Sequence, residues 1–112
     1  MKQNVKNLLL VVSLLFSSAI LAAPQCSAEA LIQAKKLLSF HSDGDERAEI
    51  LSDEKVKQLP SIRNPSNKKQ KFQVLALNGY VYKGEYRMRF IYYHLGSTCV
   101  LMGQEILEIA KL

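Results

Sequence analysis

The stretch FQVLALNGYVYKGEYRMRFIYYHL, residues 72–95, decides the fold of this chain. Two runs rich in aromatic and branched side chains, 72–82 and 85–95, flank the dipeptide Lys83-Gly84. Such runs are typical of β-strands, and a dipeptide with Gly between them is typical of a two-residue turn. The sequence therefore predicts an antiparallel β-hairpin that turns at Lys83 and Gly84.

The turn also predicts which residues of the hairpin face one another. With Lys83 and Gly84 in the turn, one face of the hairpin is uniformly apolar, and a slip of one residue would mix the two faces. The pairs expected on the apolar face are Val81 with Tyr86, Gly79 with Met88, Leu77 with Phe90 and Leu75 with Tyr92. The pairs expected on the opposite face are Tyr82 with Glu85, Tyr80 with Arg87, Asn78 with Arg89, Ala76 with Ile91 and Val74 with Tyr93. We expect the apolar face to be buried.

A third strand is predicted over residues 98–110, after a turn at residues 96–97. This turn places Cys99 opposite His94, and both then lie on the apolar face. Leu101 falls opposite Tyr92 on the same face. The three strands together form an antiparallel meander.

The third strand contains one conflict with its apolar face. Strict alternation would bury Glu105, and we expect a bulge at Gly103 to redirect that carboxylate, because an isolated glycine in a strand often marks a bulge. Residues 104–112 also carry apolar side chains at helical spacing, so a C-terminal helix is the alternative.

The part of the chain before the hairpin predicts a helix followed by an irregular segment. Residues 27–40 have an apolar stripe at helical spacing, with Ser27 as a candidate cap. Residues 41–65 are rich in turn signals. Within them the sequence predicts a short strand over 47–51 and a short helix over 53–59.

The first 22 residues resemble a secretory signal peptide in their three-part pattern. Two lysines precede a short apolar run that ends in small residues, which predicts cleavage after Ala22 or Ala23. The run is shorter than the roughly 20 apolar residues of a membrane span, so an uncleaved anchor is the weaker alternative. A lipid-modified cysteine needs a small residue immediately before it, whereas Pro24 and Gln25 precede Cys26, so we expect no lipid anchor. We expect a periplasmic or secreted chain, 23–112, with no stable membrane anchor.

The exported chain contains two cysteines, Cys26 and Cys99. In an oxidising compartment an even pair predicts one disulfide. The two cysteines are too far apart to form the closely spaced Cys-x-x-Cys pair that is typical of zinc sites, so we expect no metal and no cofactor. A bridge between these positions would stabilise the fold by roughly 4 kcal/mol through loop closure.

Taken together, these elements predict a single small α+β domain. Its N-terminal helix packs on a three- or four-stranded antiparallel meander and is stapled by the disulfide. The chain has 112 residues, which is too short for a TIM barrel or a doubly wound sheet.

Charge is segregated along the chain. Residues 41–54 hold six carboxylates against one arginine, a net charge of −5, and residues 61–89 hold seven cations against one carboxylate, a net charge of +6. The outer hairpin face combines basic and aromatic side chains, the types enriched where proteins bind partners. The candidate binding residues are Tyr80, Tyr82, Arg87, Arg89 and Tyr93. An ordinary solvated sheet face is the competing interpretation.

The function predicted from these features is that of a small exported, non-catalytic binding protein. Its partner would be a protein or an anionic envelope component, and an inhibitor or immunity protein is one form of it. Nucleic acid is disfavoured because export separates the chain from most of it. The sequence leaves the oligomeric state open.

The alternative is a metal-dependent or accessory envelope enzyme built on His41 and the acidic loop. Asp43, Asp45 and Glu54 occupy three ligand positions of a calcium loop, but Ala48 stands where that loop needs Gly. No spacing of Ser, Cys and His selects a catalytic triad. We therefore predict no enzyme and assign no catalytic residues.

Overall fold

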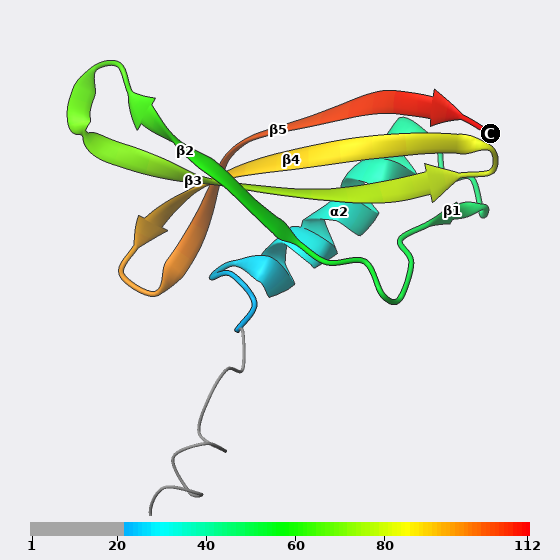
Figure 1. Cartoon of the computed structure of the whole chain (residues 1–112), viewed down its shortest axis with the longest axis horizontal. Helices are drawn as coiled ribbons and strands as arrows, with labels where there is room; N and C mark the ends of the chain where they lie inside the picture. Colours follow the sequence, from blue (N-terminus) through cyan, green and yellow to red (C-terminus); the bar gives the residue numbers. More distant parts are fainter. Residues whose placement is uncertain (1–21) are drawn as a thin grey trace, which may run out of the picture.

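The computed structural model describes residues 22–112, and the predicted signal segment, apart from Ala22, lies outside the described residues. One helix, α2 (Ser27–His41), is followed by five strands that form one antiparallel sheet (Figure 1). The strands are β1 (Ala48–Glu49), β2 (Lys57–Asn64), β3 (Asn67–Val81), β4 (Gly84–Leu95) and β5 (Thr98–Lys111). The α+β class is confirmed, but the expectation of three or four strands is wrong.

The two additional strands both pair with β3, which is long enough to serve two partners along one edge. β1 pairs with the end of β3 at Tyr80 and Val81, and β2 pairs with its first half. The prediction of a helix over 53–59 is therefore wrong, because β2 begins at Lys57. Pairing with β3 gives this backbone its hydrogen-bond partners and overrides a weak local preference. The short strand predicted over 47–51 exists only at β1.

The hairpin of β3 and β4 is confirmed, but its turn lies one residue earlier than predicted. Val81 pairs with Gly84, so Tyr82 and Lys83 form the turn, and Tyr82 has a left-handed φ of 53°. Every pair is therefore displaced by two residues; Leu77, for example, faces Met88. Because the displacement is even, the same side chains still share each face.

Gly84 is needed for a reason other than the turn. A Cβ atom at this position would lie 2.9 Å from Cε2 of Tyr86, so the glycine makes room for the tyrosine ring. Of the predicted turn dipeptide, Lys83 belongs to the turn, whereas Gly84 is the first residue of β4 and lies against the ring of Tyr86.

β5 agrees with the predicted third strand and excludes the C-terminal helix. Cys99 pairs with His94 and Leu101 with Tyr92, as expected. The register shifts between Ile91 and Tyr92, where Gly103 lies opposite Ile91. The bulge predicted at Gly103 is thus confirmed, and it places Glu105 opposite Arg89.

The buried residues of α2, β3 and β4 form one hydrophobic cluster. Phe90 and Met88 lie at its centre with no exposed surface. The other members are Cys26, Ala30, Ala34, Leu37, Leu38, Leu75, Leu77 and Tyr92. Burial of these side chains supplies the main free energy of folding.

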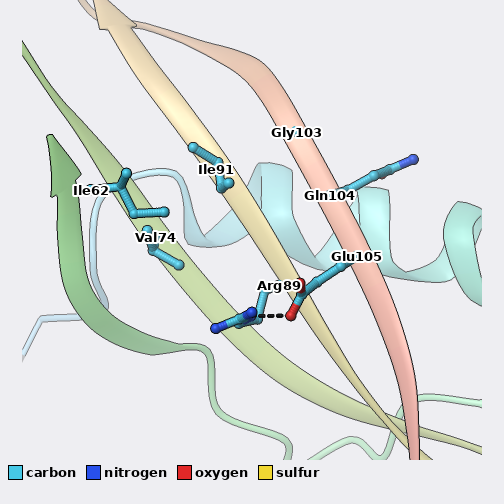
Figure 2. A pocket seen from close by; sticks show the side chains of 7 residues that line it. All are labelled: Ile62, Val74, Arg89, Ile91, Gly103, Gln104 and Glu105. Carbon is cyan, nitrogen blue, oxygen red and sulfur yellow. Dashed lines mark hydrogen bonds and ion pairs between the residues drawn. The ribbon is translucent and has the colours of Figure 1, made fainter. Parts of the chain in front are cut away.

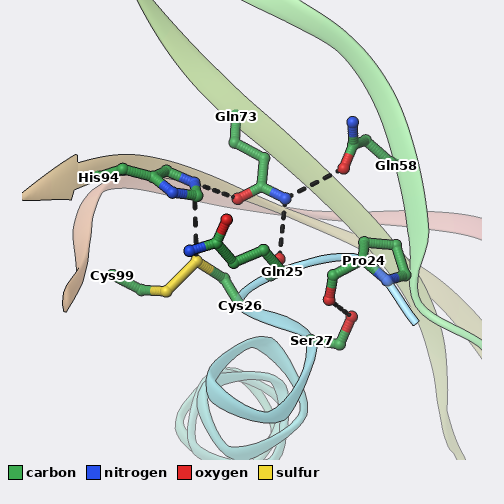
Figure 3. The surroundings of a disulfide bond; sticks show 8 residues. All are labelled: Pro24, Gln25, Cys26, Ser27, Gln58, Gln73, His94 and Cys99. Carbon is green, nitrogen blue, oxygen red and sulfur yellow. Dashed lines mark hydrogen bonds between the residues drawn. A yellow bond between two sulfur atoms is a disulfide. The ribbon is translucent and has the colours of Figure 1, made fainter. Parts of the chain in front are cut away.

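The predicted disulfide joins Cys26 to Cys99 and ties the start of α2 to β5 (Figure 3). Cys26, rather than Ser27, is the N-cap residue, and the cap has no side-chain hydrogen bond. Beside the bridge, Nε2 of His94 lies 2.6 Å from Oε1 of Gln73, whose Nε2 donates to the carbonyl of Gln25 at 2.8 Å. These bonds fasten the chain before α2 to the sheet.

Candidate functional site

The candidate site is the outer face, which we define as the sheet face whose side chains do not belong to the hydrophobic cluster. Val74 and Ala76 of β3 are buried but lie outside that cluster. Their partners across the hairpin are Ile91 and Arg89, which project from the same side of the sheet. Figure 2 shows the side chains of Val74, Arg89 and Ile91 on the side away from α2.

A hollow of about 230 Å³ lies at the centre of the outer face (Figure 2). It exists because Gly103 has no side chain, and a Cβ there would meet only Cδ1 of Ile91 at 3.6 Å. The residues that line it are Ile62, Val74, Arg89, Ile91, Gly103, Gln104 and Glu105. The hollow thus has an apolar side from β2, β3 and β4 and an ionic side from β4 and β5.

An ion pair between Arg89 and Glu105 forms the ionic side of the hollow. The hydrogen bond from Arg89 is the main cause that holds the pKa of Glu105 below its ordinary value. The same bond raises the pKa of Arg89. Both side chains are more than one-third exposed, so water screens the pair and limits what it adds to stability.

Arg87 differs from Arg89 in having no carboxylate partner among the ion pairs of residues 22–112. Its Nε is buried and has no hydrogen-bond partner within the described part of the chain. Leu107, its neighbour on β5, is 45% exposed. The outer face therefore offers one neutralised arginine and one that is free to bind an anion.

The three predicted tyrosines lie at different places along the hairpin, and only Tyr80 is a diagonal neighbour of Arg87 in the strand register. Tyr80 donates a hydrogen bond to Glu85 at 3.2 Å, and burial followed by this bond raises the pKa of Tyr80. Tyr82 occupies the exposed turn, where the guanidinium carbon of Arg47 lies 4.6 Å from its ring centroid. The hairpin therefore does not bring all five candidate residues into one cluster.

Tyr93 lies near the opposite end of the hairpin from the Tyr82 turn. Its ring contacts that of Phe72 edge to face, with centroids 6.2 Å apart. This contact uses an aromatic surface that the sequence alone suggested for a partner. Tyr93 nevertheless remains partly exposed.

Sequence reasoning missed Ile62 of the hollow, because Ile62 belongs to β2, which was not predicted, and no periodic pattern marks it. Glu105 was expected to leave the buried face through a bulge at Gly103, but its pairing with Arg89 was not predicted.

The residues on which the enzyme alternative depends contact different partners in the structure. His41 contacts the ring of Tyr86 edge to face at 5.2 Å. Glu54 accepts a hydrogen bond from the backbone N–H of Asn78 at 2.8 Å, filling the gap on β3 between its pairings with β1 and β2. Asp45 accepts bonds from Arg47.

A group of potential metal ligands does occur in the described residues, but at the disulfide. Cys26, Glu29 and Cys99 are close enough to share an ion. Both sulfur atoms are bonded to one another, so neither is a free thiolate that could bind a metal. The group therefore supports no metal site.

The pKa of Asp45 reports whether Arg47 binds this carboxylate in the acidic loop. Arg47 donates from Nε and Nη2, at 3.0 and 2.7 Å, and from its backbone N–H at 2.9 Å. These bonds lower the pKa of Asp45 to about 2. We expect carboxyl NMR titration to find that value, and Arg47→Ala to raise it towards, but not to, the ordinary 3.8, because the backbone donor stays.

The direction of the Asp45 shift also predicts its effect on stability. Because the pKa is depressed in the folded state, its stabilising contribution is present above pH 4 and is lost as the pH falls towards 2. A wild-type titration midpoint near 3.8, unchanged in Arg47→Ala, would contradict the bonding seen here.

Comparisons of the chain with protein-family models, curated proteins and solved structures gave no match. Among residues 22–112, α2 is the only helix, and it is neither long nor apolar enough to span a membrane.

Proposed function

We propose that this chain is a small exported, non-catalytic binding protein that holds a protein partner on its outer face. Export rests on the signal-like first 22 residues, and the disulfide is consistent with an oxidising compartment. Inhibition or neutralisation of the partner is one form that this activity can take.

The observation that carries the proposal is that the outer face exposes apolar side chains at two places, one in the hollow and one next to Arg87, which has no ion-pair partner within residues 22–112. Ile62 is 44% exposed and Leu107 is 45% exposed, and they lie on opposite sides of the hairpin's outer face. Exposed apolar groups together with an arginine are a usual composition of a binding hot spot, in which arginine is enriched.

Arg87 supplies specificity in this proposal. A partner carboxylate that reaches the outer nitrogens of its guanidinium would form a charge-assisted hydrogen bond and neutralise a charge that has no ion-pair partner within residues 22–112. Arg89 serves a different purpose, because its guanidinium is already bound by Glu105. The pair leaves the ionic side of the hollow without net charge, so a partner is selected there by shape complementarity.

The decisive variant is therefore Arg87→Glu and not a double reversal that includes Arg89. We expect Arg87→Glu to weaken the complex roughly 30-fold or more, since it removes the anchor and repels the carboxylate. The partner would be captured from the envelope fraction with the wild-type protein and identified. Its affinity for each purified variant would then be measured by calorimetry.

Lys36→Glu is the matched control, because it reverses one exposed cation on α2 and changes the net charge equally. It should bind the partner within about twofold of wild type. Ile62→Asp provides a second test that does not depend on Arg87. If both outer-face variants bind as tightly as the control, the outer face is an ordinary solvated surface and the proposal is wrong.

A further inference from the structure

The hairpin of β2 and β3 carries a concentration of positive charge that the outer face does not use. We name residues 57–71 the basic hairpin. Its cations are Lys57, Arg63, Lys68, Lys69 and Lys71, and all five are exposed. The sequence contains no Asp or Glu between residues 57 and 84. None of the five takes part in an ion pair of the described structure.

The strand register places two of these cations directly against one another. Arg63 pairs with Lys71 across the two strands. Like charges in directly opposed positions destabilise a sheet, and an opposite charge at either position would stabilise it. The folded protein therefore presents repelling charges that an external anion can neutralise.

The end of the basic hairpin is held in a defined shape. The side-chain oxygen of Asn64 accepts from the backbone N–H of Ser66 at 2.9 Å, and that of Asn67 accepts from the N–H of Lys69 at 3.2 Å. Such bonds are characteristic of ordered Asx turns. Figure 1 shows this turn projecting as one extremity of the molecule, on the side where α2 begins. Its cations are therefore accessible without rearrangement of the domain.

The spacing of the cations indicates the kind of anion. A β-strand rises about 3.3 Å per residue, so the two cations of β2, Lys57 and Arg63, lie roughly 20 Å apart along the strand. Side chains distributed in this way do not converge on a single small anion. They match a surface that carries many negative groups at once.

Two surfaces of that kind are a nucleic acid and a bilayer. Single-stranded nucleic acid binds where free aromatic rings stack on bases. The aromatic residues nearest to the basic hairpin, Phe72 and Tyr93, contact one another instead. The cluster of cations without free aromatic rings resembles the basic segments that bind anionic lipid headgroups.

We propose that the basic hairpin binds the protein to the surface of a membrane that contains anionic phospholipid. Each cation near such a surface strengthens binding roughly fivefold at moderate salt. The outer face and the basic hairpin then serve separate purposes, with one holding a partner and the other placing the protein at the membrane.

Vesicle sedimentation tests the proposal with purified protein and no other component. We expect binding to vesicles that contain phosphatidylglycerol, no binding to phosphatidylcholine alone, and loss of binding as salt is raised. Lys68→Gln with Lys69→Gln should weaken binding about 25-fold, the product of two fivefold factors. Lys35→Gln with Lys36→Gln removes the same charge from α2 and should weaken it less than threefold.

The remaining outcomes would overturn the proposal. Equal binding to both vesicle types, or equal loss in the hairpin and α2 variants, would leave no specific role for the hairpin. Tighter binding to a short oligonucleotide than to anionic vesicles would show that the basic hairpin binds nucleic acid rather than a membrane. Arg87→Glu should keep vesicle binding and the hairpin variant should keep the outer-face partner, so each proposal can fail alone. Unfolding midpoints of all variants verify that they are folded.

Discussion

Replacement of Cys26 and Cys99 by alanine is expected to lower the free energy of unfolding by about 4 kcal/mol. The bond connects residues 73 positions apart, so it removes a large amount of conformational freedom from the unfolded chain. In a domain of this size the loss corresponds to a fall of roughly 15 to 30 °C in the unfolding midpoint. Urea denaturation followed by circular dichroism would measure it.

Reduction of the wild-type protein is the control for this experiment. The reduced chain keeps both sulfur atoms, so it loses the loop constraint but not the packing of Cys26, which is 4% exposed. Reduced wild type should therefore be somewhat more stable than the double variant. A loss below about 1 kcal/mol in both would show that the bridge does not stabilise this fold.

The second large effect is expected for Phe90→Ala, which should cost about 3 to 5 kcal/mol. The Phe90 side chain has no exposed surface and lies in the cluster shared by α2 and the sheet. Its removal leaves a cavity that the disulfide-tied elements cannot easily close. The same denaturation experiment would measure the loss.

Phe40→Ala is the matched control, because Phe40 is the same residue type but 83% exposed. Its effect should stay within about 0.5 kcal/mol. If the two variants were equally stable, the cluster around Phe90 would not be the core of this protein. The comparison depends only on burial, since the chemical change is identical.

Both predictions concern the inner face of the sheet, whereas the proposed functions use other surfaces. The inner face is committed to α2, the cluster and the disulfide. The outer face and the basic hairpin carry groups that have no partner within residues 22–112: the buried Nε of Arg87 lacks a hydrogen bond, and the opposed charges of Arg63 and Lys71 lack an ion pair. Unsatisfied groups of this kind are what a binding partner can stabilise.

Local sequence patterns were sufficient for the hairpin, the third strand and the helix. Alternation of apolar side chains over residues 72–95 identified the buried face correctly, even though the turn was misplaced. The assignment of side chains to the two faces stayed correct, because only a register displacement by an odd number of residues would move them to the other face. The pairing of Cys99 with His94 and the bulge at Gly103 followed from the same alternation.

The candidate site was less accessible to such reasoning. Ile62 lies in β2, whose polar sequence has no strand periodicity, and it becomes part of the outer face only by pairing with Phe72. Arg87 and Arg89 look equivalent in the sequence. They differ in the structure because the bulge in β5 delivers Glu105 to one of them.

The sequence by itself determined the elements whose residues alternate between an apolar and a polar environment: α2, the β3–β4 hairpin, β5 and the pair of cysteines that joins them. These elements are encoded locally, because burial of one face requires a regular pattern. Only the tertiary structure decided that a polar segment would become β2, which arginine would be neutralised, and that Arg63 would oppose Lys71. Those outcomes depend on contacts between residues distant along the chain, and such contacts leave no periodic trace in the sequence.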